Sequence, residues 1–142
     1  MTTREDDETS IASIVDRYRA GFAAMDPEIL ITVWDPQYDG IVYVAQEVAD
    51  PIHGWAQVEA YYRRLPSANP ADRVIEMRVD DLSIDIFGDV ALAFCTFHFV
   101  GEADGRAFVA DGRVTFLLHR QAGEWKVIHY HESAPPVHLP DG

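Results

Sequence analysis

The apolar residues of this chain change their spacing once along the sequence, and this change constrains the fold more than any other feature. Up to about residue 65 they recur at three- and four-residue intervals, as on one face of a helix. From Val74 to Ser133 they alternate with polar residues, as in strands. Helices followed by a run of strands indicate an α+β domain. A chain of 142 residues, 48% of them hydrophobic, suits one such domain with a single core.

Three helices are predicted in the first half. The first covers residues 11–25, with Thr9 or Ser10 as its N-cap, and we expect the acidic segment 1–8 before it to be disordered. Asp26-Pro27 begins a short second helix, which ends near residue 34 before Asp35-Pro36. A β-branched run at 40–45 predicts a strand, and residues 54–65 have the spacing of a third helix.

Long strands are predicted at 74–86, 90–101, 106–120 and 124–133, separated by turn signals at 88–89, 104–105 and 121–123. The alternating pattern shifts at Asp80-Asp81, which indicates a β-bulge. We therefore expect a strongly bent antiparallel sheet that curls around the helices. Its outer face stays partly apolar, so a second subunit is the simplest cover and a homodimer is predicted.

Composition excludes several classes of partner. The formal net charge is -13, from 11 basic and 24 acidic residues, which argues against nucleic acid and against anionic membrane surfaces. No apolar run approaches the ~20 residues that span a bilayer, and the acidic start does not resemble a signal peptide, so a cytoplasmic protein is expected. The one cysteine, Cys95, lies in an apolar run and is predicted to be a buried thiol. No metal or cofactor is predicted, because cysteine pairs and phosphate-binding glycine loops are absent.

The last hairpin carries a family resemblance. Residues 115–125, followed by 127–135 with the run His129-Tyr-His-Glu-Ser133, resemble the terminal hairpin of the association domain of calcium/calmodulin-dependent protein kinase two and its bacterial SnoaL-like relatives. Trp34-Asp-Pro36, His53-Gly54 and Asp104-Gly105 fall where that family has similar residues. Residues 8–138 as a whole resemble the nuclear transport factor two-like superfamily, which includes ketosteroid isomerases and polyketide cyclases. The resemblance implies one cone-shaped domain over 9–138, with a pocket between the sheet and the helices.

Strand alternation then divides the last strand between pocket and outer face. Tyr130 and Glu132 share one face. In the kinase association domain the position that resembles Glu132 carries an arginine facing the pocket, so the resemblance places both residues inward. The opposite face is predicted to form subunit contacts through Arg113, Thr115, His129 and His131. Two histidines at this spacing also suit a metal ion, but the neighbouring arginine disfavours it.

Two further residues are candidates for catalysis beside Glu132. Counted back from the turn at 104–105, His98 matches a pocket arginine of the kinase domain, and it would form a base with Glu132 as the orienting carboxylate. Tyr18 matches the first-helix tyrosine with which ketosteroid isomerases stabilise an oxyanion. Both residues also have a plain structural interpretation as buried core side chains. The base of those isomerases falls near Val42, which cannot accept a proton.

The remaining pocket candidates are aromatic: Trp55, Tyr61, Tyr62, Phe94 and Phe116, with Tyr130. An acidic aromatic pocket favours a neutral or cationic apolar ligand. Glu47, Asp50 and His53 lie beside its mouth, as a solvated loop or as a lid.

Two hypotheses for the function remain open. One is a small-molecule-binding domain acting as a cofactor-independent isomerase, dehydratase or cyclase; the other is a non-enzymatic oligomerisation or regulatory module like the kinase association domain.

Overall fold

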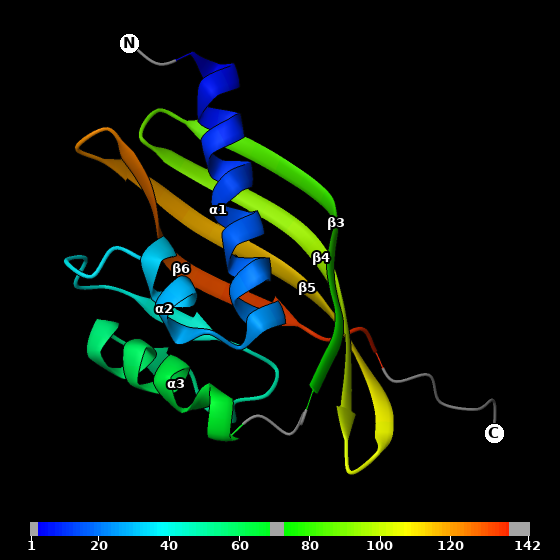
Figure 1. Cartoon of the computed structure of the whole chain (residues 1–142). Coiled ribbons are helices and arrows are strands. Elements are labelled where there is room, and N and C mark those ends of the chain that lie inside the picture. Colours follow the sequence, from blue (N-terminus) through cyan, green and yellow to red (C-terminus); the bar gives the residue numbers. More distant parts are fainter. Residues whose placement is uncertain (1–2, 69–72, 137–142) are drawn as a thin grey trace.

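The computed structural model describes residues 3–68 and 73–136 as a bent sheet with helices on its concave side (Figure 1). The helices are α1 (Arg4–Ala24), α2 (Pro27–Leu30), extended by a 3-10 turn at Ile31–Val33, and α3 (Trp55–Ala68). The strands are β1 (Val42–Val44), β2 (Ile52–His53), β3 (Arg73–Phe87), β4 (Val90–Ala103), β5 (Arg106–Gln121) and β6 (Glu124–Ser133). The predicted α+β class is confirmed.

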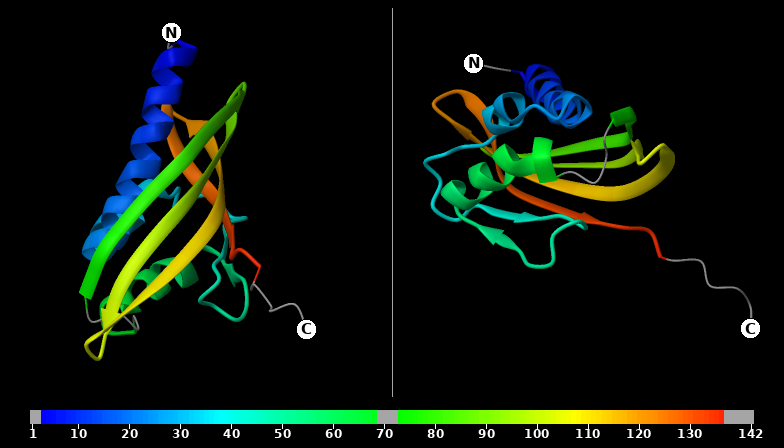
Figure 2. Two further views of the ribbon diagram at one scale, coloured as in Figure 1. Left: turned by 90° about the vertical axis from the view of Figure 1, so that its right-hand side faces the viewer. Right: turned by 60° about the horizontal axis from the view of Figure 1, so that its bottom comes forward.

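The sheet has the strand order β2-β1-β6-β5-β4-β3. Strands β3 to β6 form the predicted antiparallel meander, whereas β1 runs parallel to β6 and places Tyr43 opposite Tyr130. The predicted bulge is present, because the register of β3 shifts between Asp80 and Ser83 and Asp81 has a φ of 56°. Such bulges increase bending, and two further views show the helices on the concave side of the curved, open sheet (Figure 2).

Helix α1 begins earlier than the sequence pattern indicates. Thr3 is its N-cap and forms a capping box with Asp6, so that residues 4–8, expected to be disordered, form the first turns. The carboxylate of Asp7 lies against the far end of the sheet, where it accepts hydrogen bonds from Arg120 Nη1 and from Trp125 Nε1, each at 3.0 Å. These contacts hold the start of α1 on the β5–β6 hairpin.

The core lies between α1, α3 and the concave face of the sheet. On β4 the inward positions are the small residues Ala91, Ala93 and Cys95, all buried, while Leu92 and Phe94 between them are partly exposed. The predicted burial of the Cys95 thiol is confirmed, and this burial raises its pKa to about 11. In the part of the chain that the structure describes, no helix is long and apolar enough to cross a membrane.

Candidate functional site

A cavity of about 530 Å³ opens between α1, α3, the loop after β1 and the wide end of the sheet. Most of its lining is aromatic or aliphatic: Tyr18, Phe22, Met25, Val48, Tyr61, Leu65, Met77, Phe97, Phe99, Phe108, Ala110 and Tyr130. The other lining residues are Gln46, Glu47, Arg64 and Glu132. Pockets of this size and character are typical of small-molecule sites.

Glu132 is the buried acidic group of this cavity. Only 6% of the residue is exposed, and its two carboxyl oxygens accept hydrogen bonds from the Tyr130 hydroxyl at 3.1 Å and from Gln46 Nε2 at 2.9 Å. Burial raises the pKa of Glu132 to about 7, and the charge of Glu47 contributes in the same direction. Near neutral pH this carboxyl is therefore present in both protonation states, as a general acid or base requires.

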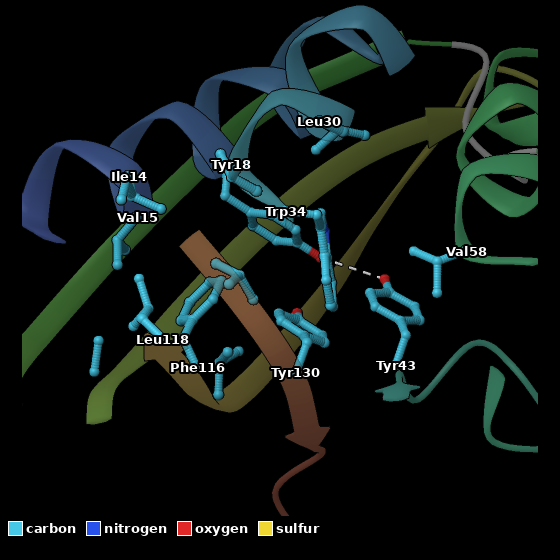
Figure 3. Close-up of a cluster of buried hydrophobic side chains, with 14 of the residues drawn as sticks. Ile14, Val15, Tyr18, Leu30, Trp34, Tyr43, Val58, Phe116, Leu118 and Tyr130 are labelled. Atoms are coloured by element: carbon cyan, nitrogen blue, oxygen red, sulfur yellow. Dashed lines mark hydrogen bonds between the residues drawn. The ribbon is translucent and has the colours of Figure 1, made fainter. Parts of the chain in front are cut away.

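Three tyrosines form the wall beside Glu132. The ring of Tyr130 stacks on that of Tyr43 at 4.8 Å between centroids and packs on that of Tyr18 at 5.0 Å. The hydroxyls of Tyr18 and Tyr43 lie 3.3 Å apart in a hydrogen bond (Figure 3). Burial, the largest cause in each case, raises the pKa of all three phenols well above the usual value. All three hydroxyls remain neutral, and those of Tyr18 and Tyr130, which line the cavity, can donate a hydrogen bond to a ligand oxygen.

The loop between β1 and β2 brings two polar residues to the cavity. Gln46 Nε2 donates both to Glu132 and to the backbone carbonyl of Asp111 at 3.2 Å. Glu47 accepts a hydrogen bond of 2.6 Å from the Tyr61 hydroxyl. Of the acidic loop residues named from the sequence, Glu47 lines the cavity, whereas Asp50 and His53 do not. Gln46 had no sequence signal, because a single loop residue shows no periodicity.

The prediction that His98 faces the pocket is wrong. Phe97 and Phe99, its neighbours on β4, line the cavity, so alternation directs His98 to the convex face. There its Nδ1 lies 2.7 Å from Oδ1 of Asp111 on β5. The count from the turn at 104–105 was one residue out of phase, and the predicted pair of His98 with Glu132 does not form.

Four of the predicted aromatic residues lie outside the cavity lining. Phe94 is on the convex face and 40% exposed, which contradicts its predicted place in the pocket. Three others pack behind the cavity wall: Trp55, Tyr62 and Phe116. The Tyr62 hydroxyl accepts a hydrogen bond from Trp34 Nε1 at 3.0 Å. Phe116 meets Tyr18 edge-on at 5.2 Å, and Trp55 packs on Trp34 at 6.5 Å. Of the predicted aromatic residues, Tyr18, Tyr61 and Tyr130 line the cavity.

The histidine pair of β6 lies on the convex face, as predicted from the family resemblance together with strand alternation. The rings of His129 and His131 are 6.5 Å apart, and His131 stands opposite Thr115. Arg113 Nε donates to the Ser133 hydroxyl at 3.0 Å. Burial, followed by the neighbouring His131, lowers the pKa of His129. Within residues 3–68 and 73–136 no group of three or more metal-ligating side chains gathers, and the role of these four residues as subunit contacts stays a prediction.

Comparison with known families agrees with this architecture. The family model described as "SnoaL-like domain" matches residues 11–137. The chain belongs to this family. A comparison with curated proteins finds no match. The resemblance predicted from the last hairpin is thereby confirmed at the level of the family.

Solved structures of the nuclear transport factor two-like group share the fold of this SnoaL-like domain. A Streptomyces avermitilis protein, provisionally described as a dehydratase, has a TM-score of 0.80 at 17% identity, over 94% of this chain and 99% of that one. The calcium/calmodulin-dependent protein kinase II hub of S. rosetta has a TM-score of 0.73 at 20% identity, over 89% and 95%. At these identities the likeness concerns the fold alone.

Proposed function

We propose that this SnoaL-like domain binds a small, largely apolar molecule in its cavity and moves a proton to or from it through Glu132, without a cofactor. The observation that supports this most is a single buried carboxyl that titrates near neutral pH inside an aromatic cavity. Burying a carboxyl costs free energy of folding, and groups with a pKa perturbed in this way are concentrated at functional sites.

The chemistry that suits these groups is proton abstraction beside a carbonyl. Ionised Glu132 takes the proton from carbon, the electron pair of the broken C–H bond forms a carbon–carbon double bond, and the π pair of the carbonyl moves onto its oxygen. Tyr18 lines the cavity with a neutral hydroxyl that can donate to this oxygen as its negative charge grows. Protonated Glu132 then returns the proton to a different carbon in an isomerisation, or to a hydroxyl that leaves as water in a dehydration. In a cyclisation the enolate carbon attacks a second carbonyl of the ligand, and the proton goes to the alkoxide that forms.

A neutral carbon acid tests this function without knowledge of the natural substrate. In D₂O the protein should accelerate exchange of the α-protons of 2-tetralone, followed by proton NMR. The rate should rise with pH through about 7, as Glu132 becomes ionised. Glu132→Gln should return the rate to that of buffer, whereas Glu124→Gln, an exposed residue of the same strand, should keep it. Exchange that survives Glu132→Gln would exclude Glu132 as the base.

A second proposal concerns assembly. The convex face exposes Val90, Leu92 and Phe94 on neighbouring outward positions of β4, and such an apolar face favours contact with a second copy. We therefore propose a homodimer, with Arg113, Thr115, His129 and His131 in the contact. Native mass spectrometry should give twice the chain mass, and Phe94→Asp should give the monomer. A ring of many subunits without 2-tetralone exchange would favour the non-enzymatic assembly module instead.

A further inference from the structure

We infer that the ligand of this cavity is an organic ammonium ion, with a positively charged nitrogen on an otherwise apolar body. The inference rests on the proposed binding function of the cavity and adds the chemical class of its ligand. Two carboxyl groups, Glu47 from the loop after β1 and Glu132 from β6, line the same cavity. Both are held by tyrosine hydroxyls that line it too, Tyr61 for Glu47 and Tyr130 for Glu132.

The walls between these carboxyls are of the kind that binds organic cations. Seven lining residues are aromatic: Tyr18, Phe22, Tyr61, Phe97, Phe99, Phe108 and Tyr130. The face of an aromatic ring attracts a cation electrostatically, and the attraction is strongest where water is excluded. The same rings attract the apolar substituents of an alkylated ammonium ion by ordinary hydrophobic burial. A neutral ligand would use the second of these contributions and leave the first unused.

The charges around the cavity point the same way. Its described lining holds one cationic side chain, Arg64, against the two carboxyls. Arg64 from α3 and Glu47 from the loop after β1 are both exposed to solvent, where their charges are screened, whereas Glu132 is buried. An anionic ligand would therefore meet net negative charge at the buried end of the cavity. The net charge of -13 for the whole chain also attracts cations to its surface.

Binding of a cation should be coupled to loss of a proton. The negative charge of Glu47 helps to raise the pKa of Glu132, and a bound cation between them has the opposite effect. The other groups that face Glu132 are the phenols of Tyr18 and Tyr130 and the amide of Gln46, which stay neutral; Arg64 lines the same cavity. Affinity for the cation should therefore increase as pH rises from 6 to 8 and Glu132 ionises.

A charged and an uncharged ligand of equal shape provide the test. Benzyltrimethylammonium and its carbon isostere 2,2-dimethyl-1-phenylpropane are compared by ligand-observed NMR at pH 6 and pH 8. At pH 8 the cation should bind at least tenfold more tightly, and this advantage should shrink several-fold at pH 6. Glu47→Gln and Glu132→Gln should each weaken binding of the cation and leave the isostere unchanged, whereas the exposed Glu124→Gln should change neither.

Equal affinity of the two compounds, or failure of the cation to bind, overturns the inference. The two experiments distinguish a wrong ligand class from a wrong proposed function. If 2-tetralone exchanges its protons but the cation has no advantage, the proton-transfer function stands and the ligand class is wrong. If the cation is preferred but 2-tetralone does not exchange, the cavity is a receptor for organic cations that performs no proton transfer.

Discussion

Replacing Asp7 by alanine should destabilise the domain, although the residue lies in an acidic run near the N-terminus. Its carboxylate is the acceptor for the indole N–H of Trp125, and the two residues are 7% and 6% exposed. A buried donor that loses its acceptor costs about 1–3 kcal/mol. For a domain of this size each kcal/mol lowers Tm by roughly 3–4 °C, so Asp7→Ala should lower Tm by roughly 3–12 °C.

Thermal unfolding followed by circular dichroism measures this loss, and the neighbouring Glu8 supplies the control. Glu8 pairs with Arg4 at 3.2 Å, and their side chains are 44% and 68% exposed, so Glu8→Ala should leave Tm almost unchanged. A double-mutant cycle of Asp7→Ala with Trp125→Phe should show a coupling energy of about 1 kcal/mol. Equal Tm values for Asp7→Ala and Glu8→Ala would mean that the start of α1 is not held against the sheet.

Three further predictions concern the cavity. Gln46→Leu removes a hydrogen bond that favours ionised Glu132, so the pKa of Glu132 and the midpoint of the 2-tetralone profile should rise by roughly half a unit; an unchanged midpoint would refute the contact. Glu132 has a raised pKa in the folded state, so the folded protein binds more protons than the unfolded chain between about pH 4.5 and 7. The free energy of unfolding of the wild type, measured with urea, should therefore fall as pH rises across this range, and that of Glu132→Gln should not. Gly112→Ala should lower the free energy of unfolding by about 1–3 kcal/mol and weaken ligand binding, because the added methyl overlaps the Phe97 ring at the cavity wall. Gly123→Ala is the control for backbone strain, because its φ is 80° and its added methyl meets open space.

The elements followed from the sequence because they depend on local alternation, whereas the inward direction of β6 came from the resemblance to the kinase association domain. Tyr130 and Glu132 lie on the concave face as expected, since every second residue of a strand shares a face. The phase of β4, counted back from the turn at 104–105, was wrong, and residue size does not reveal it because size and burial oppose each other there. Ala91 and Ala93 are fully buried, whereas the larger Leu92 and Phe94 are partly exposed. The small residues mark the inward face, which places Phe97 inward and His98 outward.

The other missed contacts join residues far apart in the chain. Asp7 looked like part of a solvated acidic terminus, and its partner Trp125 is 118 residues away. Gln46 reaches Glu132 from a loop, 86 residues before it in the sequence. No local pattern of charge or hydrophobicity encodes such pairs, because they form only when the sheet curves around the helices.

The account depends most on Glu132 as a carboxyl that titrates near neutral pH within the cavity. Carbon-13 NMR of the glutamate side-chain carboxyls, with Glu132 assigned by comparison with Glu132→Gln, measures its titration directly from pH 4 to 9. The structure predicts a midpoint of about 7. A midpoint near 4, the ordinary value for an exposed glutamate, would contradict both the burial of this group and its proposed role in proton transfer.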